Sequence, residues 1–98
     1  MEIKKNLNGT ELIVALEGAL DTTTAPELQE SLADDLNNVQ SITFDLAELR
    51  YISSSGLRVL LSTHKSMSNK GGMKIKNLND IVQEVFDVTG FSDILVIE

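Results

Sequence analysis

A period of two in the side chains, typical of strands with one buried face, appears along two stretches of the chain. The first lies within residues 1–16, where the large apolar residues alternate in Leu12-Ile13-Val14-Ala15-Leu16. Asn8-Gly9 stands between two extended runs and predicts a two-residue turn, so this segment is expected to form a hairpin. Residues 41–46 show the same alternation and predict a further strand.

Helical spacing follows the hairpin. Leu28, Leu32 and Leu36 recur every four residues and predict one amphipathic helix that ends at Asn37-Asn38. Thr24, with Glu27 three residues later, predicts a capping box at its start, and Pro26 is tolerated in a first turn. Residues 17–21 are expected to leave the sheet and lead into this helix.

Two more helices are expected further along the chain. The second begins at residues 53–56 and ends at 70–72, and one face holds Leu57, Leu60, Leu61, His64 and Met67. The third is capped by Asn79 and ends at Gly90, where a positive φ is favoured. Its expected inward positions are Ile81, Val82, Val85 and Phe86.

Residues 73–78 and 94–97 are short apolar runs that predict two last strands, and residues 47–52 are expected to be a connection. The predicted order is therefore β-β-α-β-α-β-α-β. Strands that alternate with helices need crossover connections, so the sheet should be mixed and mostly parallel, in an α/β fold. A chain of 98 residues has room for one core, so residues 1–98 are expected to form one domain.

Composition excludes several classes of function. The chain has no cysteine and one histidine, which argues against thiolate or multi-histidine metal sites, and no cofactor is expected. Its formal net charge of −7 argues against direct binding to nucleic acid or to an anionic membrane. No apolar run approaches the ~20 residues of a membrane span, and no secretory signal is visible, so a cytoplasmic location is expected.

The motifs of common enzymes are also missing. The serine segment reads Tyr51-Ile52-Ser53-Ser54-Ser55-Gly56-Leu57, which is no G-x-S-x-G elbow, and no Walker A or H-E-x-x-H motif occurs. The only candidate base, His64, lies on the same predicted helix, roughly 14 Å from the serines. We therefore expect that the protein is not an enzyme. We also expect His64 to be a core or half-buried residue.

Three serines in a row open the second predicted helix. Serine is a preferred N-cap residue, so one of Ser53, Ser54 and Ser55 has a structural reason to be there. Three exceed what a cap needs. The other hydroxyls are expected to face solvent, within reach of a kinase.

The segment from Asp45 to Leu57 resembles the signature segment of the STAS domain, a family named for sulphate transporters and anti-sigma-factor antagonists. Gly18-Ala19-Leu20-Asp21 is similar to the family's earlier G-x-L-D turn, and residues 85–91 are similar to its late helix ending in T-G-hydrophobic. The three matches occur in family order and span nearly the whole chain. The resemblance implies the SpoIIAA-like fold, with helices packed mainly on one face of the sheet.

The resemblance also implies a function, that of an anti-sigma-factor antagonist (anti-anti-sigma factor). Such a protein, when unphosphorylated, binds an anti-sigma factor that is itself a serine kinase and so frees the sigma factor; a phosphoserine phosphatase would reset the switch. The family acceptor directly follows an Asp and corresponds here to Ser54, with Ser53 and Ser55 as alternatives. Ser53 stands where the family has that Asp, which removes a negative charge and adds a second possible acceptor.

A partner surface can be outlined around these serines. Arg58 and Lys65 could meet acidic groups of a partner, and Val59 is expected on the outer face of the helix as a hydrophobic contact. Asp21 either belongs to this surface, as the resemblance implies for its turn, or only caps that turn. The full expected set is Asp21, Thr22, Thr23, Ser53, Ser54, Ser55, Gly56, Arg58, Val59 and Ser62.

Two other functions remain open at this point. The chain could be a STAS module of another assembly without a phospho-switch, such as a stressosome scaffold or the cytosolic subunit of a lipid ABC transporter. The size of the native complex, or its presence in a membrane fraction, would distinguish that case. A small enzyme that uses the serines is the third hypothesis, and labelling by a serine-reactive phosphonate would reveal it.

Overall fold

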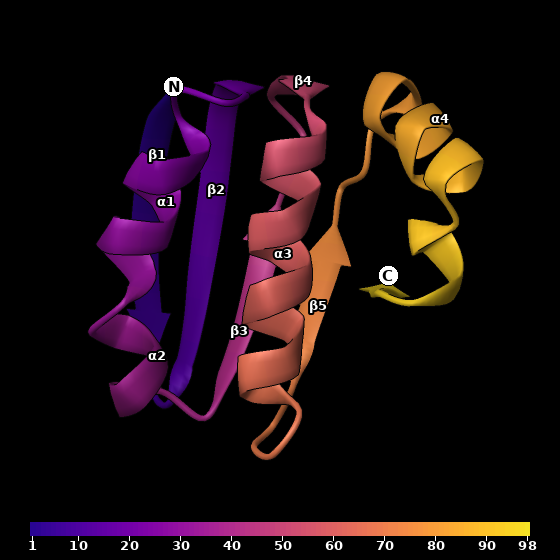
Figure 1. Cartoon of the computed structure of the whole chain (residues 1–98). Coiled ribbons are helices and arrows are strands. Elements are labelled where there is room, and N and C mark those ends of the chain that lie inside the picture. The colour runs from indigo at the N-terminus through magenta and orange to yellow at the C-terminus, as the bar shows by residue number, and fades with distance from the viewer.

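A mixed sheet carries the helices on one face in the computed structural model, which describes residues 1–98 (Figure 1). The sheet order is β1-β2-β3-β5-β6, and β4 pairs with β2. Only β1 and β2 are antiparallel, and the other pairs are parallel. The elements are β1 (Glu2–Asn8), β2 (Glu11–Leu20), α1 (Ala25–Leu32), α2 (Asp35–Asn38), β3 (Ser41–Asp45), β4 (Leu49–Ile52), α3 (Ser54–Met67), β5 (Met73–Lys76), α4 (Asp80–Thr89), the 3-10 helix η1 (Phe91–Asp93) and β6 (Val96–Ile97).

The predicted α/β class and mostly parallel sheet are confirmed, but the hairpin turn is displaced by one residue. Asn8 pairs with Glu11, so the two-residue loop is Gly9-Thr10 rather than Asn8-Gly9. Gly9 has a φ of +67°, a conformation that glycine adopts without strain. β3 and β5 end one and two residues before their predicted ends.

The strand β4 is the main element that the predicted order lacks. Residues 17–21 do not leave the sheet at Glu17, because β2 runs on to Leu20 and pairs there with β4. The register shifts after Gly18, so that Gly18 pairs with Leu49 and Ala19 with Tyr51, and Arg50 has no partner on β2. This irregularity puts two exposed residues between buried Leu49 and buried Ile52, which hides the strand from a search for strict alternation.

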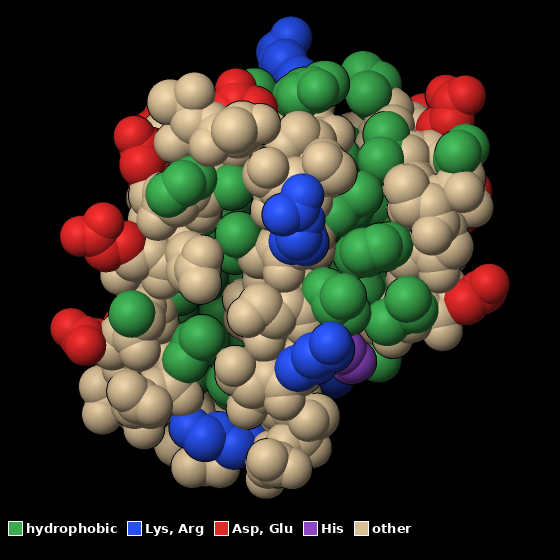
Figure 2. Space-filling model, viewed as in Figure 1, with side chains coloured by type: hydrophobic (Ala, Val, Ile, Leu, Met, Phe, Trp, Pro, Cys, Tyr) green, Lys and Arg blue, Asp and Glu red, His purple; other side chains and the backbone are tan.

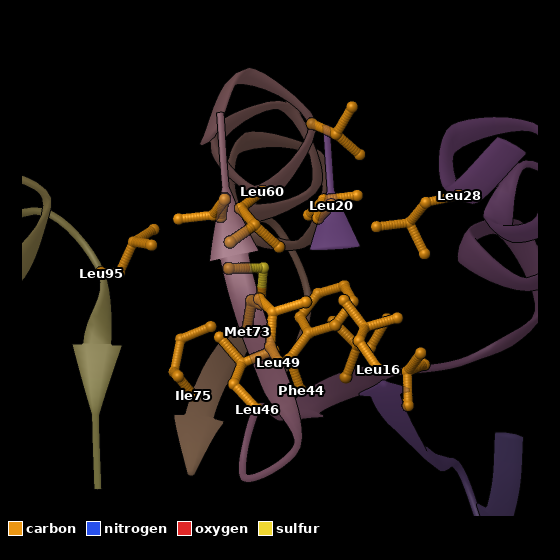
Figure 3. Packing of buried hydrophobic residues seen from close by; sticks show 14 of the residues in the cluster. Leu16, Leu20, Leu28, Phe44, Leu46, Leu49, Leu60, Met73, Ile75 and Leu95 are labelled. Carbon is orange, nitrogen blue, oxygen red and sulfur yellow. The ribbon is translucent and has the colours of Figure 1, made fainter. Parts of the chain in front are cut away.

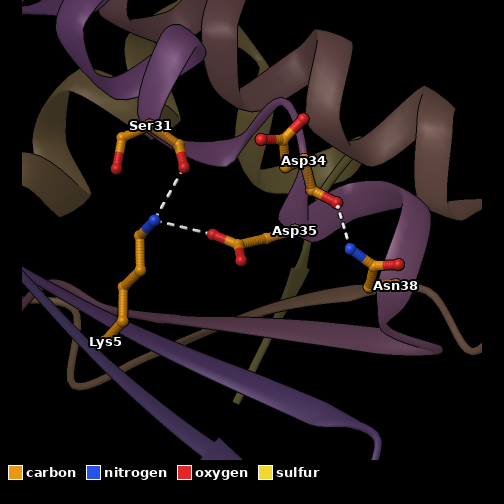
Figure 4. Close-up of polar contacts among 5 residues, drawn as sticks. All are labelled: Lys5, Ser31, Asp34, Asp35 and Asn38. Atoms are coloured by element: carbon orange, nitrogen blue, oxygen red, sulfur yellow. Dashed lines mark hydrogen bonds and ion pairs between the residues drawn. The ribbon is translucent and has the colours of Figure 1, made fainter.

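The predicted first helix is broken into α1 and α2. Leu28 and Leu32 are fully buried, but Leu36 is only partly buried. The Lys5 amine donates a 2.6 Å hydrogen bond to the carbonyl of Ser31 and lies 2.6 Å from the Asp35 carboxylate, across the break (Figure 4). Asp and Asn side chains compete with helical hydrogen bonds, so this Asp- and Asn-rich segment accepts the break readily.

The third predicted helix is confirmed as α4 with both of its end signals. The Asn79 side chain accepts the backbone N–H of Val82 at 3.0 Å, and Gly90 is left-handed with a φ of +82°. Ile81 is the exception among the inward positions, because it is 60% exposed. The expected strand 94–97 shortens to β6, and buried Leu95 is the residue that anchors this end.

The core lies between the sheet and the helices and holds 22 buried hydrophobic residues. Leu16, Phe44 and Ile75 come from three strands and point toward Leu28 of α1 and Leu60 of α3 (Figure 3). Each such side chain contributes about 1.5–3 kcal/mol relative to exposure. None of the helices is both long and apolar enough to cross a membrane.

The buried face of α3 is wider than the predicted stripe. Leu57, Leu60 and Met67 are buried as expected, while Leu61 and His64 are half-buried. Val59 is only 7% exposed, so its expected place on the outer face is wrong. The reason is that α3 packs against α1 as well as against the sheet, and Val59 faces α1.

Candidate functional site

The carboxyl ends of β2 and β4 meet at the start of α3. Leu20 and Ile52 are paired in register, and the backbone N–H of Ser53 donates to the carbonyl of Leu20 at 2.9 Å. This bond places the turn after β2 next to the serine triplet. Carboxyl ends of parallel strands are where α/β folds usually bind ligands and partners, so the location fits a binding site.

The three serines have different environments. Ser53 is the N-cap of α3, and its hydroxyl accepts the backbone N–H of Gly56 at 3.3 Å. Ser54 is the first residue of the helix and is exposed, while Ser55 is half-buried. Asp and Ser are both strong N-cap residues, so Ser53 keeps the cap at the position where the resemblance places an Asp. Ser54 is the exposed residue of the triplet.

Gly56 lets α3 sit directly on the strand ends. A Cβ atom there would lie 2.7 Å from Cγ of Leu20, 2.9 Å from the Leu20 carbonyl oxygen and 3.0 Å from Cγ1 of Ile52. A side chain would therefore push the first turn of α3 away from β2 and β4. The close contact fixes the position of Ser54 two residues earlier.

The turn between β2 and α1 is closed by its own side chains. The Asp21 carboxylate accepts the backbone N–H groups of Thr23 at 2.9 Å and Thr24 at 3.0 Å. The Thr24 hydroxyl donates to the carbonyl of Ala19 at 2.8 Å and accepts the N–H of Asp21 at 2.8 Å. The hydrogen bonds that the Asp21 carboxylate accepts, that from the Thr24 amide first, hold the pKa of Asp21 below its ordinary value.

This turn contradicts the predicted capping box and confirms one of the two roles that were expected for Asp21. Thr24 is the N-cap of α1, but its side chain makes no capping hydrogen bond, so the predicted capping box with Glu27 is wrong. Asp21 does cap its turn. Its role as a partner contact stays a prediction, as it does for exposed Thr22 and Thr23.

A groove of about 600 Å³ runs between α1 and α3. Five of the expected partner residues line it, and the other five lie in the adjoining turn and the first turn of α3. Sequence reasoning missed the α1 side, Ala25, Pro26 and Gln29, although Pro26 and Gln29 are uncharged positions on an acidic helix. The α1–α3 groove is lined by Thr22, Ala25, Pro26, Gln29, Ser55, Arg58, Val59, Leu61, Ser62 and Lys65.

The charge of the α1–α3 groove is opposite to that of the whole chain. Its lining includes Arg58 and Lys65 and no carboxylate, whereas the chain has a net charge of −7. The two ion pairs of the structure involve Lys4 and Lys5, so both groove cations are unpaired. In Figure 2, Lys and Arg side chains lie over α3, while Asp and Glu gather toward the sides of this face.

The site has no base beside its hydroxyls. His64 follows Ser54 by ten residues on α3, about 15 Å along the helix axis. Its Nδ1 atom is buried and makes no hydrogen bond. No group of three or more His, Cys, Asp and Glu side chains is placed to hold a metal ion. The arrangement presents the exposed Ser54 beside a groove that carries two cations.

Comparison with known proteins finds the same pattern over nearly the whole chain. A family model described as the STAS domain matches residues 2–98. The anti-sigma-B factor antagonist of Bacillus subtilis (strain 168) is 32% identical over 96 residues, which cover 97% of this chain and 86% of that protein. The anti-sigma F factor antagonist of Paenibacillus polymyxa is 34% identical over 89 residues, covering 88% and 76%.

Solved structures share the fold at lower sequence identity. An anti-sigma factor antagonist from Mycobacterium paratuberculosis matches with a TM-score of 0.88 at 18% identity, over 98% of this chain and 83% of that one. The Bacillus protein SpoIIAA in its phosphorylated form matches with a TM-score of 0.77 at 16% identity, over 99% and 91%. The predicted SpoIIAA-like fold is therefore confirmed.

Proposed function

Because the chain belongs to the STAS domain family, we propose that it is an anti-sigma factor antagonist that works by partner switching. In its unphosphorylated form it binds an anti-sigma factor with serine kinase activity and so releases a sigma factor. Phosphorylation of Ser54 by that partner ends the interaction, and a phosphoserine phosphatase restores it. The whole cycle takes place in the cytoplasm.

One observation carries this proposal: Ser54 is exposed in the first turn of α3, beside the α1–α3 groove. Its neighbours are less suited to be acceptors. The Ser53 hydroxyl is engaged as the helix cap, and Ser55 is half-buried in the groove lining. Relatives named anti-sigma factor antagonists, 32% and 34% identical, support the same conclusion.

The physical effect of the phosphate is expected to be local. A phosphoserine has a charge of about −1.5 to −2 at neutral pH, and the free N–H groups and dipole of a helix N-terminus favour it. The domain should therefore keep its fold. SpoIIAA offers a parallel, because its unphosphorylated and phosphorylated structures match this chain with TM-scores of 0.78 and 0.77.

A phosphate in the middle of a docking surface is enough to act as a switch. Disturbing the buried centre of an interface commonly costs 2 kcal/mol or more, which is roughly a thirtyfold loss of affinity. The proposed surface joins exposed Ser54, in the first turn of α3, to the α1–α3 groove, so a partner that covers both would enclose Ser54.

Paired baits test the proposal. Ser54→Ala should keep the partner and prevent phosphorylation, whereas Ser54→Glu should fold and bind at least tenfold more weakly. Ser66→Glu is the matched control, because it adds the same charge to an exposed position three turns away on α3. The measurement is capture of partners from the source lysate, followed by calorimetric titration of the purified anti-sigma factor.

Three outcomes would contradict it. Equal affinity of the Ala and Glu variants would remove Ser54 from the mechanism. Loss of binding in the Ser66→Glu control as well would mean that net charge, not position, decides the result. Recovery of both baits in a megadalton particle or a membrane fraction would favour a STAS module of another assembly.

A further inference from the structure

We propose that Arg58 binds the phosphate on Ser54, so that phosphorylation also withdraws a cation from the α1–α3 groove. This inference rests on Ser54 being the proposed acceptor. It adds Arg58, on the same helix, as a residue that binds the added phosphate. The switch then changes the charge of the groove as well as the space above the first turn of α3.

The spacing of the two residues supports this pairing. Ser54 and Arg58 are both exposed residues of α3, four positions apart. Residues at this spacing are neighbours on a helix surface, with Cβ atoms about 5–6 Å apart. An anion on the N-terminal side of a cation is the more favourable order for such a pair. Phosphorylated Ser54 followed by Arg58 has that order.

Arg58 is also chemically available for the phosphate. It takes part in neither of the two ion pairs of the structure, so the phosphate displaces no existing partner. Its planar guanidinium donates two parallel hydrogen bonds to phosphate oxygens, a geometry that a lysine amine lacks. The other groove cation, Lys65, lies eleven positions after Ser54, about 16 Å along the axis, and cannot make this contact.

The consequence reaches beyond the modified residue. Before modification, Arg58 and Lys65 give the groove lining two positive charges and no negative one. Afterwards, Arg58 faces the phosphate, and Lys65 alone remains free to meet a partner. A partner that approaches with acidic groups therefore loses an attraction at Arg58 and meets a repulsion at Ser54.

The test uses the full chain with phosphoserine installed at position 54 during translation, and needs neither kinase nor partner. The second ionisation of the phosphate is followed by ³¹P NMR at about 0.15 M salt in three proteins: unsubstituted, Arg58→Gln and Lys65→Gln. The Asp21 carboxylate in the adjoining turn and the helix N–H groups are the same in all three. Differences therefore report the two cations.

Loss of Arg58 should raise the second phosphate pKa by about 0.5, and loss of Lys65 by under about 0.1. Equal pKa values in the unsubstituted and Arg58→Gln proteins would overturn the inference. So would an equal rise in both variants, which would mean a general charge effect. Because no partner is involved, the partner-switching proposal can fail while this result stands, and the reverse also holds.

Discussion

Replacing Gly56 by alanine tests whether the first turn of α3 must rest on the strand ends. The added methyl group would lie 2.7 Å from Cγ of Leu20 and 2.9 Å from the carbonyl oxygen of the same residue. Leu20 is fully buried, and its carbonyl already accepts the N–H of Ser53 at 2.9 Å, so neither atom can move aside freely. The helix must shift instead.

The expected loss of stability follows from two opposing effects. Overpacking of a closed site costs typically 1–3 kcal/mol. Alanine is better than glycine in a helix by up to about 1 kcal/mol, which offsets part of that. A net loss of about 1–2 kcal/mol of unfolding free energy is expected, and each kcal/mol lowers Tm by about 4–8 °C in a domain of this size.

Urea unfolding gives the free energy, and amide chemical shifts show where the structure moves. Gly90→Ala serves as the comparison, because Gly90 has open space around it and a φ of +82°, so alanine there meets backbone strain alone. In Gly56→Ala the amide signals of Ser53 and Ser54 should shift, and in Gly90→Ala they should not. A Gly56→Ala protein as stable as the unsubstituted chain would refute the packing argument.

Three further substitutions test the supports of the site and the fold. Ser53→Ala should lower the unfolding free energy by about 1 kcal/mol in thermal melts, while Ser53→Asp should not, because both Ser and Asp cap helices; equal melts for Ala and Asp would contradict the cap. Lys5→Met should cost about 0.5–1 kcal/mol and speed amide hydrogen exchange in α1 and α2, since it removes the contacts to Ser31 and Asp35. Lys4→Met, whose Glu17 pair is more exposed, is its control and should cost less. Asp21→Asn should be less stable than the unsubstituted chain near neutral pH. The difference in urea midpoint should close as the pH falls from 3.8, the ordinary pKa of an Asp side chain, through the lowered pKa of Asp21. A difference that persists in acid would mean that the charge of the carboxylate does not matter.

Features fixed by a few neighbouring residues could be predicted from the sequence. The caps of α3 and α4 and the left-handed Gly90 depend on local hydrogen bonds and backbone preference. The sequence predicts Asn79 and Gly90 at the positions where they occur, and it predicts the cap of α3 at one of the three serines. The α/β order followed from the spacing of apolar residues. The resemblance to the STAS family predicts that the segments around residues 18–21 and 45–57 belong to one site, and the pairing of β2 with β4 does bring the two segments together.

Features that depend on distant contacts could not be predicted. The break between α1 and α2 is bridged by Lys5, 26 and 30 residues away along the chain. The strand β4 forms because β2 pairs with β3 up to Ala15 and with β4 from Gly18 onward, and no local pattern in residues 49–52 predicts this pairing. Val59 faces α1 rather than solvent, and the α1–α3 groove with its α1 lining becomes visible only when both helices are in place.

The start of α3 combines rigid positions with one that is free to change. Ser53 holds the cap and Gly56 holds the contact with Leu20, so loss of the capping side chain or a side chain added at Gly56 is expected to disturb the helix. Ser54 lies between them, exposed and at the end of the helix where negative charge is favoured. The proposed phosphate on Ser54 is therefore expected to leave Ser53 and Gly56 in place. The proposed switch depends on this separation, because a modification that unfolded the first turn of α3 would also disturb the surface proposed for the partner and the phosphatase.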